Sequence, residues 1–362
     1  MVNGVNLLFQ FLDNFAFIVL AAAGLAIIFG IMGVINLAHG EFIMVGAYAT
    51  TLANIRYGLP LIVAVPVAMF VTALFGLVVE RTIISGAAPN WLWKYVRMGL
   101  AGGLGRLAAL DAVPGRVAGG LEAAAERLPE QPLVEPLYDR LADSMVATWG
   151  LSLILVQGVR IWFGNSLDQV GTPVVPFVGE TVSPGEIPVL NLIVTNSEFS
   201  YSAYRVSLAV IALGVLAVVY VLFTKTDFGM RARATIQDED TARALGVDTG
   251  RTYMATFAIG SALAGLTGAL YAPTITMVPD MGTGFLVESF VAVVVGGPSV
   301  VLGTTMAGGF LGAISATVTN LMGSTFYGRI ALLLTAIVLI RFLPSGISGF
   351  VRTIRERRQE AT

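Results

Sequence analysis

Cysteine is absent from the 362 residues, and histidine occurs once, at His39. The first absence excludes disulfides and thiolate nucleophiles, and together they exclude a metal site built from several cysteines or histidines. Charged residues are also scarce, at 12% of the chain, whereas soluble domains usually carry about 25%. So little charge leaves too little polar surface for a water-facing globule, so we expect membrane lipid as the surroundings. The net charge of −2 gives no sign of a nucleic-acid partner.

Long apolar runs fill the chain, which is 56% hydrophobic with a mean hydropathy of +0.81. A helix needs roughly 17–25 apolar residues to cross the hydrocarbon core of a bilayer, and it satisfies its backbone groups internally. The candidate spans are 14–32, 42–57, 60–83, 144–163, 203–224, 252–273, 284–297, 299–322 and 327–343. They predict an all-α polytopic membrane protein with about nine transmembrane helices, in a range of about eight to ten because the seventh run is short enough to be re-entrant.

Lysine and arginine give these crossings a direction, because they concentrate in short loops on the cytoplasmic side. They occur repeatedly in 84–143, in 225–251 and in the tail, but not at all in 164–202 or 273–283. About nine crossings join these segments consistently, with the N-terminus outside and the C-terminus inside. The N-terminus lacks the basic region and cleavage site of a secretory signal, so we expect it to be retained.

These assignments divide the chain into six parts. They are helices one to three in 1–84, a cytoplasmic insertion in 85–143, helices four and five with a periplasmic loop (164–202) in 144–224, a cytoplasmic loop in 225–251, helices six to nine in 252–343 and a basic cytoplasmic tail in 344–362. In the insertion, Trp91 and Trp93 are typical of an interfacial anchor, and 117–128 is typical of an amphipathic helix. An embellishment lying on the membrane, a regulatory role and an extra span in 98–120 remain alternatives.

The polar residues Asn36, His39 and Glu41 lie between two apolar runs and are bracketed by glycines, so that a discontinuous helix is expected near 33–42. Polar side chains within membranes are costly and usually face a cavity or a partner. One interpretation is therefore a lining of the solute path, or a hinge beside it. The other is a tight turn at the cytoplasmic surface with solvated side chains. A proton relay through His39 and Glu41 is less well supported, because no chain of buried acids continues it.

A short helix is predicted at about 239–245 in the loop 225–251. Thr235 and Asp238 fit a capping box at its start, and Gly246 fits a C-cap. Ala242 and Leu245 are three residues apart, a spacing that places side chains on one helix face. A capped helix with a small apolar face suits docking into a groove of another protein. An ordinary solvated helix is the alternative.

Glu288 and Ser289 lie about a turn into the short apolar run near 284–297. Glu288 is the best single candidate for a buried polar group at the solute path, and a capping or interhelical hydrogen bond is the alternative. The glycines that follow are no phosphate loop, since no lysine follows at the required spacing. No catalytic set can be built around the one histidine, so we expect no enzyme activity in this chain, and any energy source must be another polypeptide.

Four stretches together resemble one family. They are 24–41 (GLAIIFGIMGVINLAHGE), 147–155 (ATWGLSLIL), 233–246, and 279–290 with PDMGTGF and ESF. The chain resembles the permease subunits of branched-chain amino acid ABC importers and, in the last stretch, more closely their urea-importer relatives. The likeness covers about 1–84 and 136–345.

The resemblance implies a multi-pass subunit of an ATP-driven importer in a bacterial inner membrane. Its partners would be a second homologous permease, two cytoplasmic ABC ATPases and a periplasmic solute-binding protein, with no cofactor on this chain and ATP used by the partners. The loop 225–251 would be the coupling loop that contacts an ATPase through Asp238, Glu239, Thr241, Ala242, Arg243, Leu245 and Gly246.

The solute would be urea or a short amide, because the outer loops without lysine or arginine suit a small neutral molecule. A branched-chain amino acid is the alternative, and a passive channel for small solutes is the alternative of another class.

Overall fold

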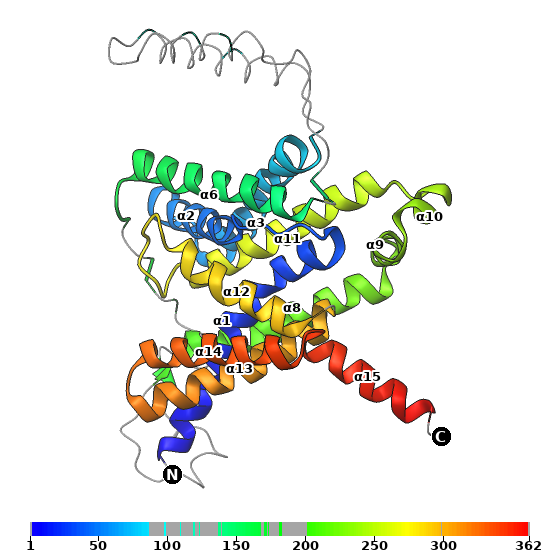
Figure 1. Ribbon diagram of the computed structural model, residues 1–362. Coiled ribbons are helices and arrows are strands. Elements are labelled where there is room, and N and C mark those ends of the chain that lie inside the picture. Colours follow the sequence, from blue (N-terminus) through cyan, green and yellow to red (C-terminus); the bar gives the residue numbers. More distant parts are fainter. Residues whose placement is uncertain are drawn as a thin grey trace.

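A computed structural model of the chain consists almost wholly of helices (Figure 1). It describes residues 2–86, 137–138, 140–167, 170–171, 181–182, 201–297 and 299–360, and positions 98, 109, 119, 123 and 173. The elements are α1 (Val2–Met32), α2 (His39–Tyr57), α3 (Leu61–Val79), the π-helical turn η1 (Glu80–Ile84), α6 (Leu141–Phe163), β1 (Thr181–Val182), β2 (Tyr201–Ser202), α8 (Ala203–Lys225), α9 (Asp227–Gln237), α10 (Glu239–Ala244), α11 (Thr249–Tyr271), α12 (Gly282–Gly296), α13 (Val300–Met322), α14 (Thr325–Phe342) and α15 (Gly346–Glu360).

Seven helices in the described part of the chain are long and apolar enough to cross a membrane. They are Asn6–Met32, Leu61–Ile84, Leu141–Phe163, Ala203–Lys225, Thr249–Tyr271, Val300–Met322 and Thr325–Phe342, and each overlaps a predicted span. The polytopic all-α prediction is thereby confirmed. The predicted span 42–57 corresponds to α2, which is not among the seven because His39, Glu41 and Arg56 lower its hydropathy. The 15 residues of α12 make it a shorter apolar helix, so the number of crossings stays a prediction.

α1 runs through the centre of the molecule, between the group formed by α2, α3, α6 and α11 and the group formed by α13 and α14 (Figure 1). In its most apolar stretch 83% of the residues are buried, against 11% in α6. A helix that is hydrophobic on all sides belongs in an interior, and α1 carries no polar side chain from Phe15 to Met32. Near the middle of α1, Phe17 stacks on Phe285 of α12 at 4.7 Å between ring centroids.

Small residues let α2 lie close to its neighbours. A Cβ atom built on Gly46 would come within 2.5 Å of Gly265 in α11, and one built on Gly40 within 2.0 Å of the carbonyl oxygen of Gly282 in α12. The first turns of α2 and α12 therefore meet backbone to backbone. This contact places the start of α2, and with it the break between α1 and α2, next to the start of α12.

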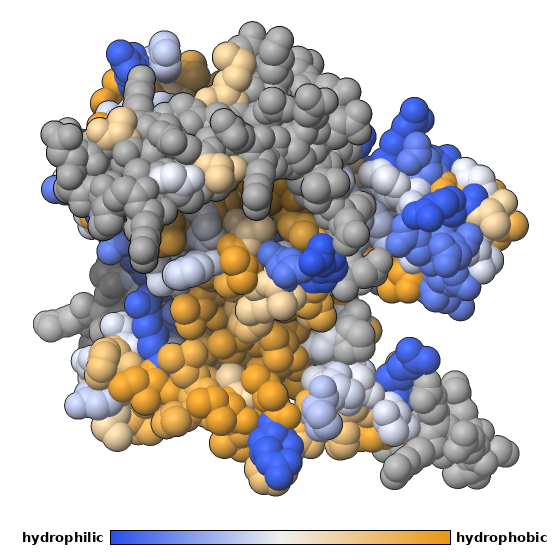
Figure 2. Space-filling model, turned by 45° about the horizontal axis from the view of Figure 1, so that its top comes forward, coloured by the Kyte–Doolittle hydropathy of each residue, from blue (hydrophilic) through white to orange (hydrophobic). Residues whose placement is uncertain are grey.

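Large apolar side chains cover the outer faces of α3, α6, α8 and α14. Examples are Ile62, Phe70, Ile154, Ile161, Val210 and Ile337. Figure 2 shows such side chains gathered over a broad hydrophobic surface. An exposed apolar surface of this extent is what lipid requires, and it agrees with the multi-pass architecture.

The loop 225–251 is helical for most of its length, since α8 extends to Lys225 and α9, α10 and the start of α11 follow. The predictions for the insertion 85–143, with Trp91, Trp93 and the helix 117–128, fall almost wholly outside the described residues. α9 and α10 form a lobe, called here the α9–α10 lobe, that projects from the same side as α15 (Figure 1). Its surface is mostly hydrophilic, at the right of Figure 2.

Candidate functional site: a polar lobe and a charged cavity

Asp238 starts α10 within the α9–α10 lobe. Its Oδ1 accepts a hydrogen bond from the backbone N–H of Thr241 at 3.0 Å, and its Oδ2 accepts one from the Thr241 hydroxyl at 2.7 Å. The backbone hydrogen bond from Thr241, followed by the one from its hydroxyl, holds the pKa of Asp238 below its ordinary value. The predicted capping box is wrong in one respect. Thr235 lies inside α9 and donates to the carbonyl of Arg231, because the helix begun at Asp227 continues to Gln237.

The end of α10 is a Schellman motif. The N–H of Gly246 bonds to the carbonyl of Arg243, and the N–H of Val247 bonds to that of Ala242, both at 3.0 Å. Gly246 has φ +88°, a left-handed conformation that glycine adopts without strain. Arg243 pairs with Glu239 at 2.5 Å, and Glu239 also accepts a hydrogen bond from the Tyr253 hydroxyl at 3.0 Å. Glu239 thereby ties α10 to α11.

Ala242 of α10 and Leu245 directly after α10 do not share an exposed face, contrary to the spacing argument. Ala242 is 3% exposed and packs inward, whereas Leu245 is 80% exposed. Leu245 is the C-cap, where the backbone leaves helical geometry, so the helical spacing rule no longer places its side chain. The lobe presents to its surroundings the apolar side chain of Leu245 beside the charges of Asp240 and Arg243.

The break predicted at 33–42 separates α1 from α2 and spans 33–38. The His39 ring donates from Nε2 to the carbonyl of Ala21 at 3.0 Å. Ala21 lies about 16 Å along the helix axis from the end of α1. The first residue of α2 therefore lies alongside the middle part of α1 and not beyond the end of α1.

The side chains at this break are buried rather than solvated. Asn36, His39, Glu41 and Ser289 are each at most 2% exposed. The side-chain oxygen of Asn36 accepts from the N–H of Ala38 at 3.0 Å, and Ser289 donates to the carbonyl of Phe285. Among the described residues, Asn36 Nδ2, His39 Nδ1 and Glu41 Oε2 find no partner. None of these four side chains lines the cavity that holds Glu288.

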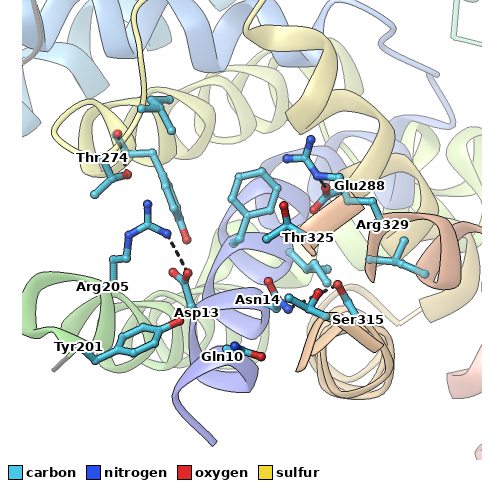
Figure 3. Close-up of a pocket in the computed structure, with 16 residues that line it drawn as sticks. Gln10, Asp13, Asn14, Tyr201, Arg205, Thr274, Glu288, Ser315, Thr325 and Arg329 are labelled. Carbon is cyan, nitrogen blue, oxygen red and sulfur yellow. Dashed lines mark hydrogen bonds and ion pairs between the residues drawn. The ribbon is translucent and has the colours of Figure 1, made fainter. Parts of the chain in front are cut away.

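This cavity, with a volume of about 410 Å³, lies near the starts of α1, α8 and α14. Three of the lining elements are far apart in sequence and converge on it, with α1 supplying Asp13 and Asn14, α12 supplying Glu288 and α14 supplying Arg329 (Figure 3). By the charge distribution of the loops, these helix starts are the ends predicted to face outward.

Two ion pairs lie in the cavity wall. Arg205 Nη1 meets Asp13 Oδ2 at 2.9 Å, and Arg329 Nε meets Glu288 Oε1 at 3.2 Å. Figure 3 shows the pairs on opposite sides of the cavity. Both carboxylates are mostly buried, with 17% and 12% of the side chain exposed, while the arginines are 40% and 64% exposed. Charged groups among membrane helices are expensive, so that their presence here indicates a function.

Asp13, Arg205 and Arg329 were missed by the sequence analysis, which placed Glu288 alone. Each is an isolated charge next to or inside an apolar run, a signal that the sequence does contain. The predicted outer loops contain no arginine, but Arg205 and Arg329 lie within the first two turns of the helices that follow those loops. Their guanidinium groups remove the argument for a neutral solute.

Membrane-crossing helices, a charged cavity among them and a polar lobe at one end define a membrane transport protein. A family comparison makes this specific. The chain belongs to the family described as branched-chain amino acid transport system, permease component, whose sequence model matches residues 7–107 and 133–343. It is thus the permease subunit of an ABC importer in the inner membrane. The unmatched stretch 108–132 falls inside the predicted insertion 85–143.

Curated relatives carry the same description. The "probable branched-chain amino acid transport permease protein LivH" of Methanocaldococcus jannaschii is 28% identical over 229 residues, 60% of this chain and 68% of that protein. The "high-affinity branched-chain amino acid transport system permease protein LivH" of Escherichia coli K12 is 23% identical over 331 residues, 91% of this chain and 90% of that protein. BraD of Pseudomonas aeruginosa, with the same description, is 24% identical over 340 residues, 91% of each chain. No solved structure matches the chain.

Proposed function

We propose that this chain forms half of a solute path with a second homologous permease, and that two cytoplasmic ATPases and a periplasmic binding protein complete the importer. ATP hydrolysis then belongs to the partners, and this chain has no catalytic role. The observation that carries the proposal is the α9–α10 lobe. It is a capped helical projection with a mostly hydrophilic surface beside the broad hydrophobic surface that Figure 2 shows.

The lobe suits mechanical coupling because both ends of α10 are secured. Asp238 caps its start, the Schellman motif closes its end, and Glu239 links it to Tyr253 of α11. A push on α10 is therefore transmitted to a long helix that packs against α1, α2 and α3. Leu245, at 80% exposure, is the most exposed large apolar side chain of the lobe and is suited to fill a groove on an ATPase.

For the solute, the proposal favours a branched-chain amino acid over urea. Relatives that align over most of the chain are named as branched-chain amino acid permeases. The cavity contains two guanidinium groups and two carboxylates, which suit a ligand carrying both charges. Urea carries no net charge and would form no ion pair with either kind of group. A passive channel would need no docking lobe.

The test is Leu245→Asp in the complete importer. Because Leu245 touches little within the chain, the substitution should leave the permease folded and in the membrane. It should abolish copurification of the ATPase and ATP-driven uptake, since a charge would be buried in the apolar groove. Leu245→Met, which conserves size and polarity, is the matched control and should retain both.

Unchanged copurification with Leu245→Asp would refute the docking role. Uptake that persists when both ATPases are made unable to hydrolyse ATP would instead favour the passive channel.

A further inference from the structure

Glu288 and Arg329 form an ion pair at the cavity wall through a single contact, between Oε1 and Nε. The side chain of Arg329 is 64% exposed. Glu288 is the only acid with which Arg329 forms an ion pair in the described part of the chain, so its Nη groups are available to a ligand. Guanidinium has five N–H donors in a planar fork that matches a carboxylate. An arginine with its fork free beside a buried acid offers donors and an acceptor within one small area.

Two further polar atoms of the same cavity are unsatisfied. The hydroxyl of Tyr271 and the side-chain oxygen of Gln10 are buried and find no partner among the described residues. Tyr271 as a whole is 3% exposed. A buried polar group without a partner costs roughly 1–3 kcal/mol, so groups left in this state around a cavity indicate that a bound molecule completes them.

An apolar wall faces these polar groups. Phe17 and Ile18 of α1, Ile275 after α11 and Leu332 of α14 line the same cavity. Leu332 also lines a second cavity of about 220 Å³ beside the Glu288–Arg329 pair. A volume of about 410 Å³ lies within the range of sites for small molecules. The cavity therefore combines groups that can bind a carboxylate and an ammonium group with an apolar surface that suits an aliphatic side chain.

We propose that this cavity binds the zwitterion of an α-amino acid with a branched aliphatic side chain, with the head group on Glu288 and Arg329. The ligand carboxylate lies on the Nη groups of Arg329, its ammonium group on Glu288, and its side chain against Phe17, Ile18 and Leu332. The Arg205–Asp13 pair forms the opposite wall and closes the cavity on the side of Tyr201. The inference rests on the proposed function, namely that the solute is an amino acid.

The charge geometry explains why both ends of the ligand are needed. A ligand with a carboxylate and no ammonium group would bind Arg329, but this carboxylate would compete with Glu288 for the same guanidinium. An ammonium group alone would compete with Arg329 for Glu288. A zwitterion engages both partners at once, and the four charges then alternate in sign around the head group.

The absence of cysteine permits a direct test. In the reconstituted complex of permease and ATPases, Thr325→Cys places one thiol in the cavity, one helical turn from Arg329. A negatively charged, membrane-impermeant thiosulfonate modifies it, and mass spectrometry follows the rate. L-leucine should slow the modification severalfold. Leucinamide, 4-methylpentanoate and urea, which lack the carboxylate, the ammonium group or both, should not.

Asp280→Cys is the matched control, because Asp280 is exposed and lies outside the cavity lining. Its modification rate should not change with L-leucine. In the Thr325→Cys background, Arg329→Gln and Glu288→Gln should each weaken protection by L-leucine about tenfold, the effect of losing one charge-assisted contact. Arg251→Gln, which breaks an exposed ion pair with Asp248 elsewhere, should have no effect.

Equal protection by leucinamide or urea, or no protection by L-leucine, would overturn the inference without any need for the charge variants. Protection that is lost with Arg205→Gln but kept with Arg329→Gln would overturn the assignment of the head group. Uptake of L-leucine by the complete importer separates these outcomes from failure of the proposed function. Uptake without protection refutes the cavity site, whereas no uptake of any amino acid refutes the proposed solute.

Discussion

Thr148 holds the break between α1 and α2 from a distant part of the sequence. Its hydroxyl oxygen accepts a hydrogen bond from the N–H of Leu37 at 3.0 Å and lies 3.2 Å from the carbonyl of Ile35. Thr148 is itself fully buried in α6. Non-helical backbone among membrane helices needs such partners, because lipid offers none. One side chain thus replaces part of the helical hydrogen bonding that the break gives up.

Thr148→Val, which keeps the shape and removes the hydroxyl, should leave the Leu37 N–H unpaired. We expect a loss of roughly 1–3 kcal/mol in stability, seen as a lower melting temperature of the purified protein in detergent. Thr224→Val is the control, because the Thr224 hydroxyl is exposed and bonds only to the carbonyl of Tyr220 in its own helix. Equal melting temperatures for the two variants would show that Thr148 does not stabilise the break.

At the scale of elements, the apolar runs predicted the helices closely, since length and hydropathy are local properties. The predicted spans 144–163 and 203–224 correspond to α6 and α8, whose ends differ by a few residues. α10 was also predictable, because acids at its start and Gly246 at its end are local signals. The prediction that Thr235 takes part in capping α10 was wrong, because α9 continues to Gln237 and includes Thr235.

The cavity depends on contacts that no local pattern encodes. Asp13 and Arg205 are 192 residues apart in sequence and meet because α8 packs against α1. Glu288 and Arg329 are each an isolated charge beside or inside an apolar run, but no local pattern shows that these two residues, 41 positions apart, form a pair. The burial of His39 was equally beyond reach, since it follows from α2 starting beside the interior of α1.

The close contact between α2 and α12 can be tested with two glycines in the first turn of α12, Gly282 and Gly284. A Cβ on Gly282 would lie 2.7 Å from the backbone of Gly40, whereas one on Gly284 would meet nothing within 4 Å. Gly282→Ala should therefore push the two helices apart and cost about 1–3 kcal/mol, as overpacking does. Gly284→Ala should be neutral or slightly stabilising, because alanine favours a helix. Thermal unfolding in detergent compares them, and equal effects would contradict the close contact.

At the scale of the whole molecule, the two proposals are compatible only if the α9–α10 lobe and the cavity lie on opposite sides of the membrane. The α9–α10 lobe must face the ATPases, and the cavity at the starts of α1, α8 and α14 must face the binding protein. The distribution of lysine and arginine predicts both placements. The number of membrane crossings depends on α2, because the polar residues in its first turn lower its hydropathy and it is not among the seven helices apolar enough to cross.

Single cysteines placed in this cysteine-free chain map its topology directly. In intact spheroplasts an impermeant maleimide should label Asp280→Cys from outside and Asp240→Cys only after permeabilisation, since both positions are exposed. Tyr57→Cys, 73% exposed at the end of α2, should be labelled from outside if α2 crosses the membrane. The unsubstituted chain controls for background. Labelling of Asp240→Cys from outside would reverse the orientation, and the lobe would then be on the wrong side to meet an ATPase.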